Sequence, residues 1–262
     1  MSGLHVVSAG QHAPGRRPVV LVHGWAMNGA VWDAFGEALA TERAVHRVDL
    51  PGHGRSPWEG RCELGEWAAA VGAAVPTGAV WIAWSLGAAV ALRAALDGCG
   101  EPAGLVPVCG TPRFVTAADW PNAMDPAALA QFGANLAADA GRTVERFLGL
   151  QVRGAQDATG TLRRLRQALR EVPPADPAAL AAGLALLQEA DLRPRLGRLR
   201  PPSLWLLGER DTLVPAAMGW QLAEWLPGAR VEIVAGAGHA PFLSHPAELL
   251  ARVRSFLAAC DD

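Results

Sequence analysis

A serine stands at the apex of a segment that reads as a strand, a sharp turn and a helix. The segment Ala83-Trp84-Ser85-Leu86-Gly87 follows the apolar run 79–82 and opens the helix-like stretch 88–96. Small residues beside the serine permit the strained turn that exposes its hydroxyl, and a helix N-terminus at that place can stabilise an oxyanion. Ala83 stands where this turn usually has glycine. The pattern predicts that Ser85 is a nucleophile, and an ordinary serine in a strand–helix turn is the plainer alternative.

Two further residues follow later strands and supply the partners that a serine nucleophile needs. Asp211 comes after the apolar run 204–207, and His239 comes after the run 231–234. Both are therefore expected to lie with Ser85 at the carboxyl edge of a parallel sheet, where catalytic groups gather. The histidine can take the serine proton, while a buried carboxylate fixes its tautomer and stabilises the imidazolium. The order Ser, Asp, His is that of α/β-hydrolases.

The acid has a rival two residues earlier, at Glu209. Asp211 is favoured because the segment 208–215 follows the pattern Gly-x-x-Asp-x-x-Val-Pro of the acid loop. Aspartate is also common in turns for conformational reasons, so a turn residue is the alternative. The segment Gly-His-Ala-Pro-Phe at 238–242 favours His239 as the base over an ordinary loop histidine.

An early strand predicts the oxyanion hole. The apolar run 18–22 is followed by His23-Gly24-Trp25. In α/β-hydrolases, the turn after that strand contains the second amide of the oxyanion hole. The backbone N–H groups of Trp25 and Leu86 are therefore predicted to form the hole. His23 is expected to order the loop and not to react. The glycine-rich segment 51–56 lacks the Gly-Lys-Ser/Thr ending of a phosphate-binding loop.

The chain resembles the α/β-hydrolases throughout its length and, more narrowly, the biotin-pathway carboxylesterases, which demethylate pimeloyl-acyl-carrier-protein methyl ester. The shared segments are 21–25, 49–56, 84–87, 142–151, 191–193 and 238–248. The catalytic segments occur in many hydrolases, whereas Arg-Thr-Val-Glu-Arg-Phe-Leu-x-Leu-Gln at 142–151 lies in the variable lid and is specific. The departures are Ala83 and a weakly matched segment from Thr111 to Ala140.

The resemblance implies an α/β-hydrolase fold, with a mostly parallel central sheet flanked by helices and a helical lid inserted after strand 6. It implies a pimeloyl-[acyl-carrier protein] methyl ester esterase of biotin biosynthesis that works through a Ser-His-Asp acyl-enzyme mechanism. No metal and no organic cofactor is expected. The substrate contacts that the resemblance implies are Trp25, Ser85, Leu86, Phe147, Leu148, Gly149, Leu150, Gln151 and His239.

The lid can be placed in the chain. An apolar strand at 104–108 is separated from the next core strand, near Ser203, by helix-like stretches at 125–137, 141–151, 160–170 and 177–190. We expect residues 1–111 to form the first part of the hydrolase core, 112–196 the helical lid, and 197–262 the second part of the core.

Composition limits the remaining possibilities. The 262 residues are 51% hydrophobic with a net charge of −2, which suits one large α/β domain. No apolar run reaches the length of a membrane helix, and the start lacks signal-peptide features. The four cysteines have no zinc or redox spacing, and Cys109 is expected to be a buried apolar side chain. A cytoplasmic monomer that binds neither membrane nor nucleic acid is expected.

Positive charge gathers in the expected lid. Between Arg142 and Arg170, seven arginines and two acidic residues give +5, which leaves −7 for the rest of the chain. Helical spacing places several of these arginines on common faces. Such a patch can attract an acidic acyl carrier protein. The alternative is a solvated helix face, and the resemblance to the biotin-pathway esterases makes that alternative the weaker one. The predicted docking residues are Arg142, Arg146, Arg163 and Arg166.

Other functions could use the same residues. A general short-chain carboxylesterase would share the triad and lack the carrier-protein role. A cofactor-free perhydrolase or a carbon–carbon bond hydrolase would also share it, whereas a haloalkane dehalogenase uses an aspartate where this chain has Ser85. A non-catalytic ligand-binding relative is disfavoured by the intact triad.

Overall fold

A seven-stranded sheet forms the centre of the computed structural model, which describes residues 3–262. The strands run in the order β1-β3-β2-β4-β5-β6-β7, with β1 antiparallel to β3 and the other pairs parallel. The expected mostly parallel sheet is therefore confirmed. The strands are β1 Val6–Ala9, β2 Val19–Val22, β3 Val45–Val48, β4 Val80–Trp84, β5 Gly104–Val108, β6 Leu204–Gly208 and β7 Arg230–Val234.

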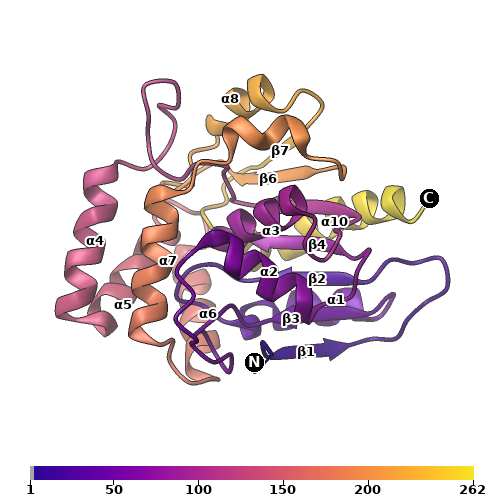
Figure 1. The fold of residues 1–262 in the computed structure, drawn as a ribbon, viewed down its shortest axis with the longest axis horizontal. Coiled ribbons are helices and arrows are strands. Elements are labelled where there is room, and N and C mark those ends of the chain that lie inside the picture. The colour runs from indigo at the N-terminus through magenta and orange to yellow at the C-terminus, as the bar shows by residue number, and fades with distance from the viewer. Residues whose placement is uncertain (1–2) are drawn as a thin grey trace.

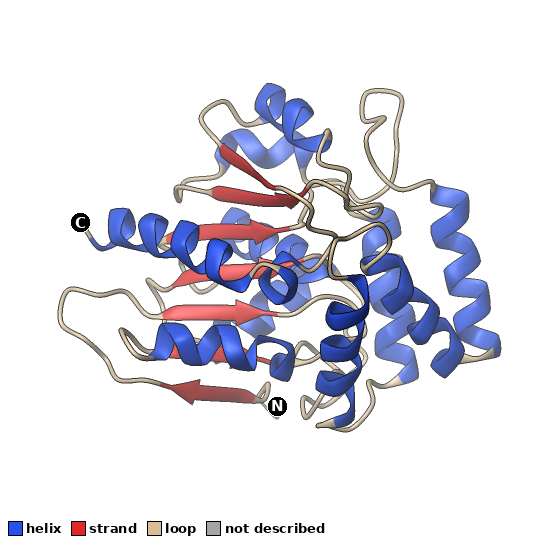
Figure 2. Ribbon diagram, turned by 180° about the vertical axis from the view of Figure 1, so that it is seen from behind, coloured by secondary structure: helices blue, strands red, loops and turns tan. Residues whose placement is uncertain are grey.

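Helices cover both faces of the sheet, because the side chains of its central strands are apolar on both faces and all buried. Figure 1 shows α2 (Leu64–Ala74) and α3 (Leu86–Asp97) in front of the sheet, and α8 (Met218–Trp225) packs into the same apolar cluster. Figure 2 shows the opposite face, which α1 (Asp33–Ala40) and α10 (Pro246–Asp261) cover.

Strand β4 illustrates how one segment serves both faces. Successive side chains of a strand point to opposite sides. Trp81 and Ala83 join the cluster beneath α2 and α3, whereas Val80, Ile82 and Trp84 join the cluster beneath α1 and α10. The strand thus ends with its backbone fixed from both sides, immediately before Ser85.

A helical block of α4 (Pro126–Ala138), α5 (Ala140–Gln151), α6 (Ala158–Arg170) and α7 (Pro177–Glu189) lies beyond the end of the sheet toward which the parallel strands point (Figure 2). The four helices expected from the sequence are confirmed to within two residues at each end. Each begins after an aspartate whose side chain accepts a hydrogen bond from a first-turn amide.

The position of this block corrects one expectation. The helices follow β5, the fifth strand, and not the sixth. We expected six strands before the helical block. The described chain forms five, because β1 is the only strand between residue 3 and the start of β2. The short helices η1 (Gly29–Trp32), η2 (Arg193–Arg198) and α9 (Pro241–Ser244) complete the fold.

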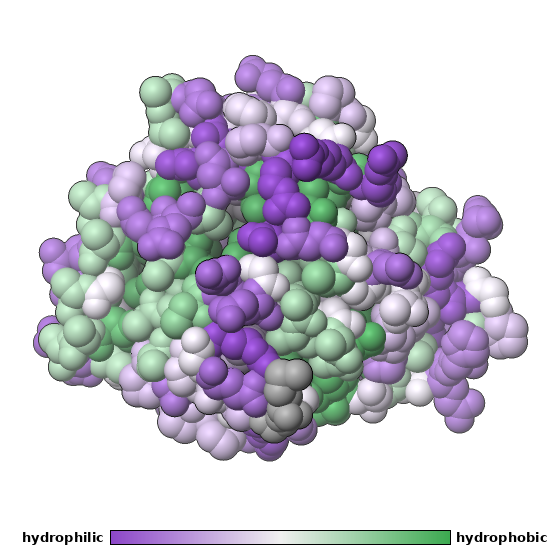
Figure 3. All heavy atoms as spheres, in the orientation of Figure 1, coloured by the Kyte–Doolittle hydropathy of each residue, from purple (hydrophilic) through white to green (hydrophobic). Residues whose placement is uncertain are grey.

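The surface is of mixed polarity. Figure 3 shows pale green, mildly apolar spheres over α4 and α7 and purple, hydrophilic groups scattered across the rest of this face. Within residues 3–262, no helix has both the length and the apolar character needed to cross a membrane.

Candidate active site

Ser85 occupies a strained turn between β4 and α3. Its backbone angles are φ 55° and ψ −119°, a conformation that few non-glycine residues adopt. Its amide donates to the Val108 carbonyl (3.1 Å). A Cβ atom on Gly87 would lie 2.5 Å from the His23 carbonyl oxygen, so the close approach of α3 to the loop after β2 requires glycine there. Ala83 pairs within the sheet without preventing the turn.

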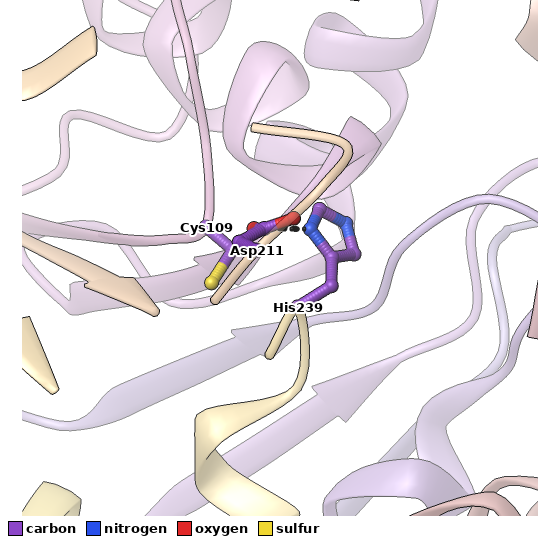
Figure 4. A group of neighbouring side chains, drawn as sticks. All are labelled: Cys109, Asp211 and His239. Carbon is purple, nitrogen blue, oxygen red and sulfur yellow. Dashed lines mark hydrogen bonds and ion pairs between the residues drawn. The ribbon is translucent and has the colours of Figure 1, made fainter. Parts of the chain in front are cut away.

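Asp211 and His239 form a buried pair. Figure 4 shows the two side chains facing each other, with His239 Nδ1 2.7 Å from Asp211 Oδ2. Asp211 Oδ1 accepts hydrogen bonds from the Leu213 and Val214 amides, at 2.8 and 3.0 Å. Neither side chain of the pair is exposed. This network assigns the proton to Nδ1, which leaves Nε2 as a hydrogen-bond acceptor.

Glu209, the alternative acid, lies elsewhere. Its side chain is about half exposed, and Oε2 accepts a hydrogen bond from the Gly236 amide (2.8 Å). Arg210 is the cation nearest to it, at 3.9 Å. The structure therefore brings Asp211, and not Glu209, to the imidazole of His239.

Ser85 and His239 each present an unpaired polar atom. Ser85 Oγ and His239 Nε2 are both buried and have no hydrogen-bond partner within residues 3–262. The backbone of His239 is held at both ends, because its amide donates to the Gln151 carbonyl (2.9 Å) and its carbonyl accepts from the Trp84 indole (2.6 Å). Buried groups left unpaired at one place are typical of a reactive site.

The two residues predicted to supply the oxyanion amides have side chains that contact α7. Leu86 is the first residue of α3, where helix amides have no intrahelical partner. Trp25 follows β2, and its indole N–H donates to the Leu180 carbonyl on α7 (2.8 Å). A Cβ atom on Gly183 would lie 2.8 Å from the Trp25 ring and 3.2 Å from the Leu86 side chain. Helix α7 therefore contacts both residues directly.

Only part of the segment 147–151, which the resemblance implied would contact the substrate, lies at the site. Phe147 packs edge-on against Trp25, with 4.8 Å between ring centroids. Gln151 is buried, and its Oε1 atom has no partner within the described chain. Leu148 packs into the apolar cluster on the α1 and α10 side, and Gly149 is exposed. Leu150 is half-buried, and its carbonyl accepts from Thr212. The structure thus brings Phe147 and Gln151 to the site and turns Gly149 away.

A narrow pocket beside Ser85 is lined by Ser85 and Cys109 together with residues that the sequence did not single out. Its volume is about 10 Å³, enough for one water molecule, so the site is closed in this conformation. The signal that could have found part of its wall is position, because Cys109 and Thr111 come within three residues of the end of β5, at the same sheet edge as Ser85. The lining residues are Ser85, Ala89, Cys109, Thr111, Pro112, Phe114, Leu186, Leu187 and Ala190.

The predicted docking arginines share one side of the helical block. Arg142, Arg146 and Arg166 line a hollow of about 720 Å³, and Arg163 and Arg166 line another of about 550 Å³. Arg166 forms an ion pair with Glu145 (2.9 Å), which offsets its charge. The Arg146 guanidinium lies 5.5 Å from the centre of the Phe132 ring.

His23 has the structural position expected of it. Its Nδ1 lies 2.8 Å from the Gly24 carbonyl oxygen, to which it donates, and Nε2 accepts from the Leu50 amide (2.9 Å). Burial lowers the pKa of His23 to about 4, against a smaller opposing effect of the Gly24 carbonyl. Burial, and then the nearby His23, lower the pKa of His53 to about 3. Both rings are neutral at pH 7 and order the loops on which they lie.

One cluster contains the atoms that a metal ion could use. Donor atoms of Cys109, Asp211 and His239 lie within 4.8 Å of one another. A tetrahedral ion bound to both Asp211 and His239 would hold their ligand atoms roughly 3.3 Å apart. The observed 2.7 Å is a hydrogen-bond distance, so the arrangement suits a shared proton better than a metal ion.

Comparisons with known proteins agree with this architecture. The sequence pattern of the alpha/beta hydrolase fold matches residues 17–246. The chain belongs to the alpha/beta hydrolase fold family. This hydrolase is 45% identical to a pimeloyl-[acyl-carrier protein] methyl ester esterase of Stenotrophomonas maltophilia (strain K279a), across 94% of this chain and 95% of the relative. It is 43% identical to an esterase of the same name from Xanthomonas oryzae pv. oryzae (strain MAFF 311018), across 92% and 95%.

A solved structure has the same fold at low sequence identity. An esterase from Exiguobacterium antarcticum superposes on this hydrolase with a TM-score of 0.86, covering 97% of this chain and 95% of the other at 19% identity. At that identity the likeness concerns the fold alone.

Proposed function

We propose that this hydrolase is a serine carboxylesterase that cleaves the methyl ester of pimeloyl-acyl-carrier protein, a step of biotin biosynthesis. The observation that carries the proposal is the 45% identity, over 94% of the chain, to an esterase named for that substrate. The match includes the helical block, where hydrolases of this fold vary most. The site described above supplies groups that ester hydrolysis requires.

The first half of the proposed reaction acylates Ser85. The ester carbonyl carbon is attacked by Ser85 Oγ while His239 Nε2 takes the hydroxyl proton. The carbonyl oxygen becomes an oxyanion, which the backbone amides of Trp25 and Leu86 stabilise. Asp211 Oδ2 holds the Nδ1 proton and stabilises the imidazolium. The tetrahedral intermediate then collapses, and His239 protonates the departing methoxide, so methanol leaves.

The second half releases the acid. A water molecule gives a proton to His239 Nε2 and attacks the acyl-Ser85 carbonyl. The same amides stabilise the second oxyanion, and Ser85 Oγ leaves with the proton from His239. The products are pimeloyl-acyl-carrier protein with a free carboxyl group and the regenerated enzyme. The protein's own groups carry each proton transfer.

The helical block serves as a lid in this proposal. We assign residues 112–196 to the lid, with residues 1–111 and 197–262 as the hydrolase core. Because Ser85 Oγ and His239 Nε2 are buried, substrate entry requires the lid to move. Phe147 and Gln151 are proposed to contact the acyl chain, together with Trp25. Leu148, Gly149 and Leu150 are proposed to shape the same wall from their places on α5.

An acidic carrier protein is the proposed partner. Its surface would meet Arg142, Arg146, Arg163 and Arg166 on the exposed side of α5 and α6. Arg142 and Arg146 form no ion pair within the described chain, so their charges are available to a partner, whereas the charge of Arg163 also acts on the nearby Asp157. A cytoplasmic monomer remains part of the proposal. The four cysteines form no disulfide within the described chain, and this part of the proposal takes them to be thiols in a reducing compartment.

Growth of a biotin-requiring bacterial strain that lacks its pimeloyl methyl esterase tests the function in cells. Expression of this chain should restore growth without biotin, and Ser85→Ala should not. In parallel, purified enzyme should release methanol from synthetic pimeloyl-acyl-carrier-protein methyl ester. Cleavage of small free esters without rescue or methanol release would favour the general carboxylesterase. Absence of labelling by a fluorophosphonate would favour a non-catalytic relative.

A further inference from the structure

Cys109 is a buried thiol for which the reaction above has no use, yet it lies beside the groups that carry the reaction. Figure 4 shows its side chain next to Asp211, on the side away from His239. The sulfur, a carboxylate oxygen of Asp211 and a ring nitrogen of His239 lie within 4.8 Å of one another, and all three residues are buried. Cys109 also lines the pocket that contains Ser85.

The thiol contacts the peptide that carries His239. Cys109 Sγ lies 3.7 Å from the Gly238 carbonyl oxygen, within the range of a thiol hydrogen bond. The amide of the same peptide, that of His239, donates to the Gln151 carbonyl (2.9 Å). The Gly238–His239 peptide is therefore held from one side by Cys109 and from the other by Gln151. A Cβ atom on Gly208 would lie 2.1 Å from the Gly238 oxygen, so this carbonyl is also closely packed.

Cys109 is itself fixed to the strands around the site. Its amide donates to the Leu206 carbonyl (2.8 Å), and the carbonyl of the residue before it, Val108, accepts from the Ser85 amide (3.1 Å). Its φ angle is +44°, which for a residue with a Cβ atom costs of order 1 kcal/mol. A strained backbone at the centre of a reactive cluster points to a side chain whose position matters.

We propose that Cys109 is a positioning residue. Its single thiol proton is shared between the Gly238 carbonyl and the Asp211 carboxylate, and so holds the Gly238–His239 peptide and the carboxylate in the arrangement that proton transfer from Ser85 requires. This inference rests on the proposed function. Burial, and then the negative charge of Asp211, raise the pKa of the Cys109 thiol well above its ordinary value. The group is therefore a neutral donor and does not compete with Ser85, since only a thiolate is strongly nucleophilic.

Asp211 is the titratable group whose charge acts on this thiol, and a ring nitrogen of His239 lies within 4.8 Å of it. The two charged residues that precede Asp211 in its loop bond elsewhere, because Glu209 accepts from the Gly236 amide and Arg210 donates to the Gly154 carbonyl. The pH response of variants at Cys109 can thus be attributed to the Asp211–His239 pair.

The test compares Cys109→Ala, which removes the donor, with Cys109→Ser, which keeps a stronger one. Cys260→Ala, at another buried cysteine far along the chain on α10, is the matched control. Active sites are counted by fluorophosphonate titration, so that kcat refers to folded enzyme. The measurements are kcat and KM for a p-nitrophenyl ester, the midpoint of the acid limb of kcat/KM, and the downfield proton resonance of His239 Nδ1–H without substrate.

In Cys109→Ala, kcat per active site should fall about fivefold, the worth of one modest hydrogen bond, with KM within twofold. The acid limb should move to higher pH, because a carboxylate that has lost a donor stabilises the imidazolium more. Cys109→Ser should move it to lower pH, and the Nδ1 resonance should shift in opposite directions in the two variants. Cys260→Ala should match the wild type in every measurement.

A merely apolar role for Cys109 predicts a different result. Cys109→Ala would then lower the melting temperature or the number of active sites, and leave kcat per site, the acid limb and the resonance unchanged; that outcome overturns the inference. If the alanine variant does not fold, Cys109→Ser decides alone, and an unshifted acid limb and resonance contradict the inference. The resonance is measured without any ester, so the failure of the proposed substrate would leave this test intact.

Discussion

The indole of Trp25 donates a hydrogen bond to the carbonyl of Leu180, although 155 residues separate them in the sequence. Trp25 lies in the loop after β2, and its backbone amide is proposed to stabilise the oxyanion. Leu180 lies on α7, which belongs to the proposed lid. If α7 moves to admit substrate, as proposed, this bond must break, so the position of α7 and the order of the Trp25 loop are physically linked.

Replacement of Trp25 by phenylalanine should loosen this connection. The ring remains able to pack against Phe147, but the hydrogen bond to Leu180 is lost, which should lower the free energy of unfolding by about 1 kcal/mol. Urea denaturation measures that change. Limited proteolysis should cut residues 112–196 faster in Trp25→Phe than in the wild type, and equal cleavage rates would show that the bond does not restrain the lid.

Loss of the Ser85 hydroxyl should abolish ester hydrolysis while leaving the fold intact. Ser85→Ala should lower kcat by several orders of magnitude, as expected for a triad member. Ser85→Gly should be equally inactive and at least as stable as Ser85→Ala, because glycine relieves the strain of φ 55°. Retention of more than roughly a tenth of the activity in either variant would exclude Ser85 as the nucleophile.

The acid is tested by two isosteric changes. Asp211→Asn should reverse the preferred tautomer of His239 and lower kcat about 10⁴-fold. Glu209→Gln should change kcat little, because Glu209 is half exposed and bonds to the Gly236 amide. Steady-state kinetics on a p-nitrophenyl ester give both values, and the reverse ranking would make Glu209 the acid.

Stability should depend on pH between 6.5 and 4.5 through two buried histidines. The folded-state pKa values of His23 and His53, about 4 and about 3, are below the unfolded value, so the unfolded chain binds more protons in this window. Folding stability should therefore decrease as the pH falls below about 6.5, by up to roughly 3 kcal/mol for His23 alone once the pH approaches 4.

Urea denaturation at pH 7.0 and pH 4.5 measures this loss. The carboxylates whose pKa is lowered by arginine partners, such as Asp97 and Asp191, stay ionised in that window and add little. Substitution of the exposed His12 by glutamine should leave the pH dependence unchanged. Equal stability at the two pH values would show that the rings of His23 and His53 are not held neutral by burial.

Reversal of the docking charges should affect a carrier-linked ester selectively. The triple change of Arg142, Arg146 and Arg163 to glutamate should lower kcat/KM for pimeloyl-acyl-carrier-protein methyl ester, and the difference from wild type should shrink as salt rises. Arg166 is left unchanged because its pairing with Glu145 would complicate the interpretation. Hydrolysis of a small free ester should barely change.

The matched control carries the same charge reversal elsewhere, at the exposed Arg16, Arg198 and Arg200. It should retain most of its activity on the carrier-linked ester at moderate salt. If the two triple variants are equally active and equally insensitive to salt, the arginines of α5 and α6 are a solvated helix face, and a general carboxylesterase becomes the better description.

The helices of the lid were predictable because their signals are local. An aspartate before each helix, often followed by proline, caps its start within a few residues of sequence. The edge strand β1 was not predicted, because its short alternating run has no distinguishing composition and depends on pairing with β3. The predicted number of strands before the helical block was wrong for a related reason. Whether a short segment becomes a strand depends on its partner in the sheet, which the local sequence does not show.

The sequence by itself determined the residues and the edge of the sheet at which Ser85, Asp211 and His239 would lie, because each comes within a few residues of the end of a strand and parallel strands end at one edge. The acid-loop pattern favoured Asp211 over Glu209, and the tertiary structure places Asp211 against His239. Only the tertiary structure decided that Leu180 meets Trp25 and that Cys109 lies against the pair. Such contacts join loops far apart in the chain. Their geometry depends on how helices and strands pack, which no local pattern records.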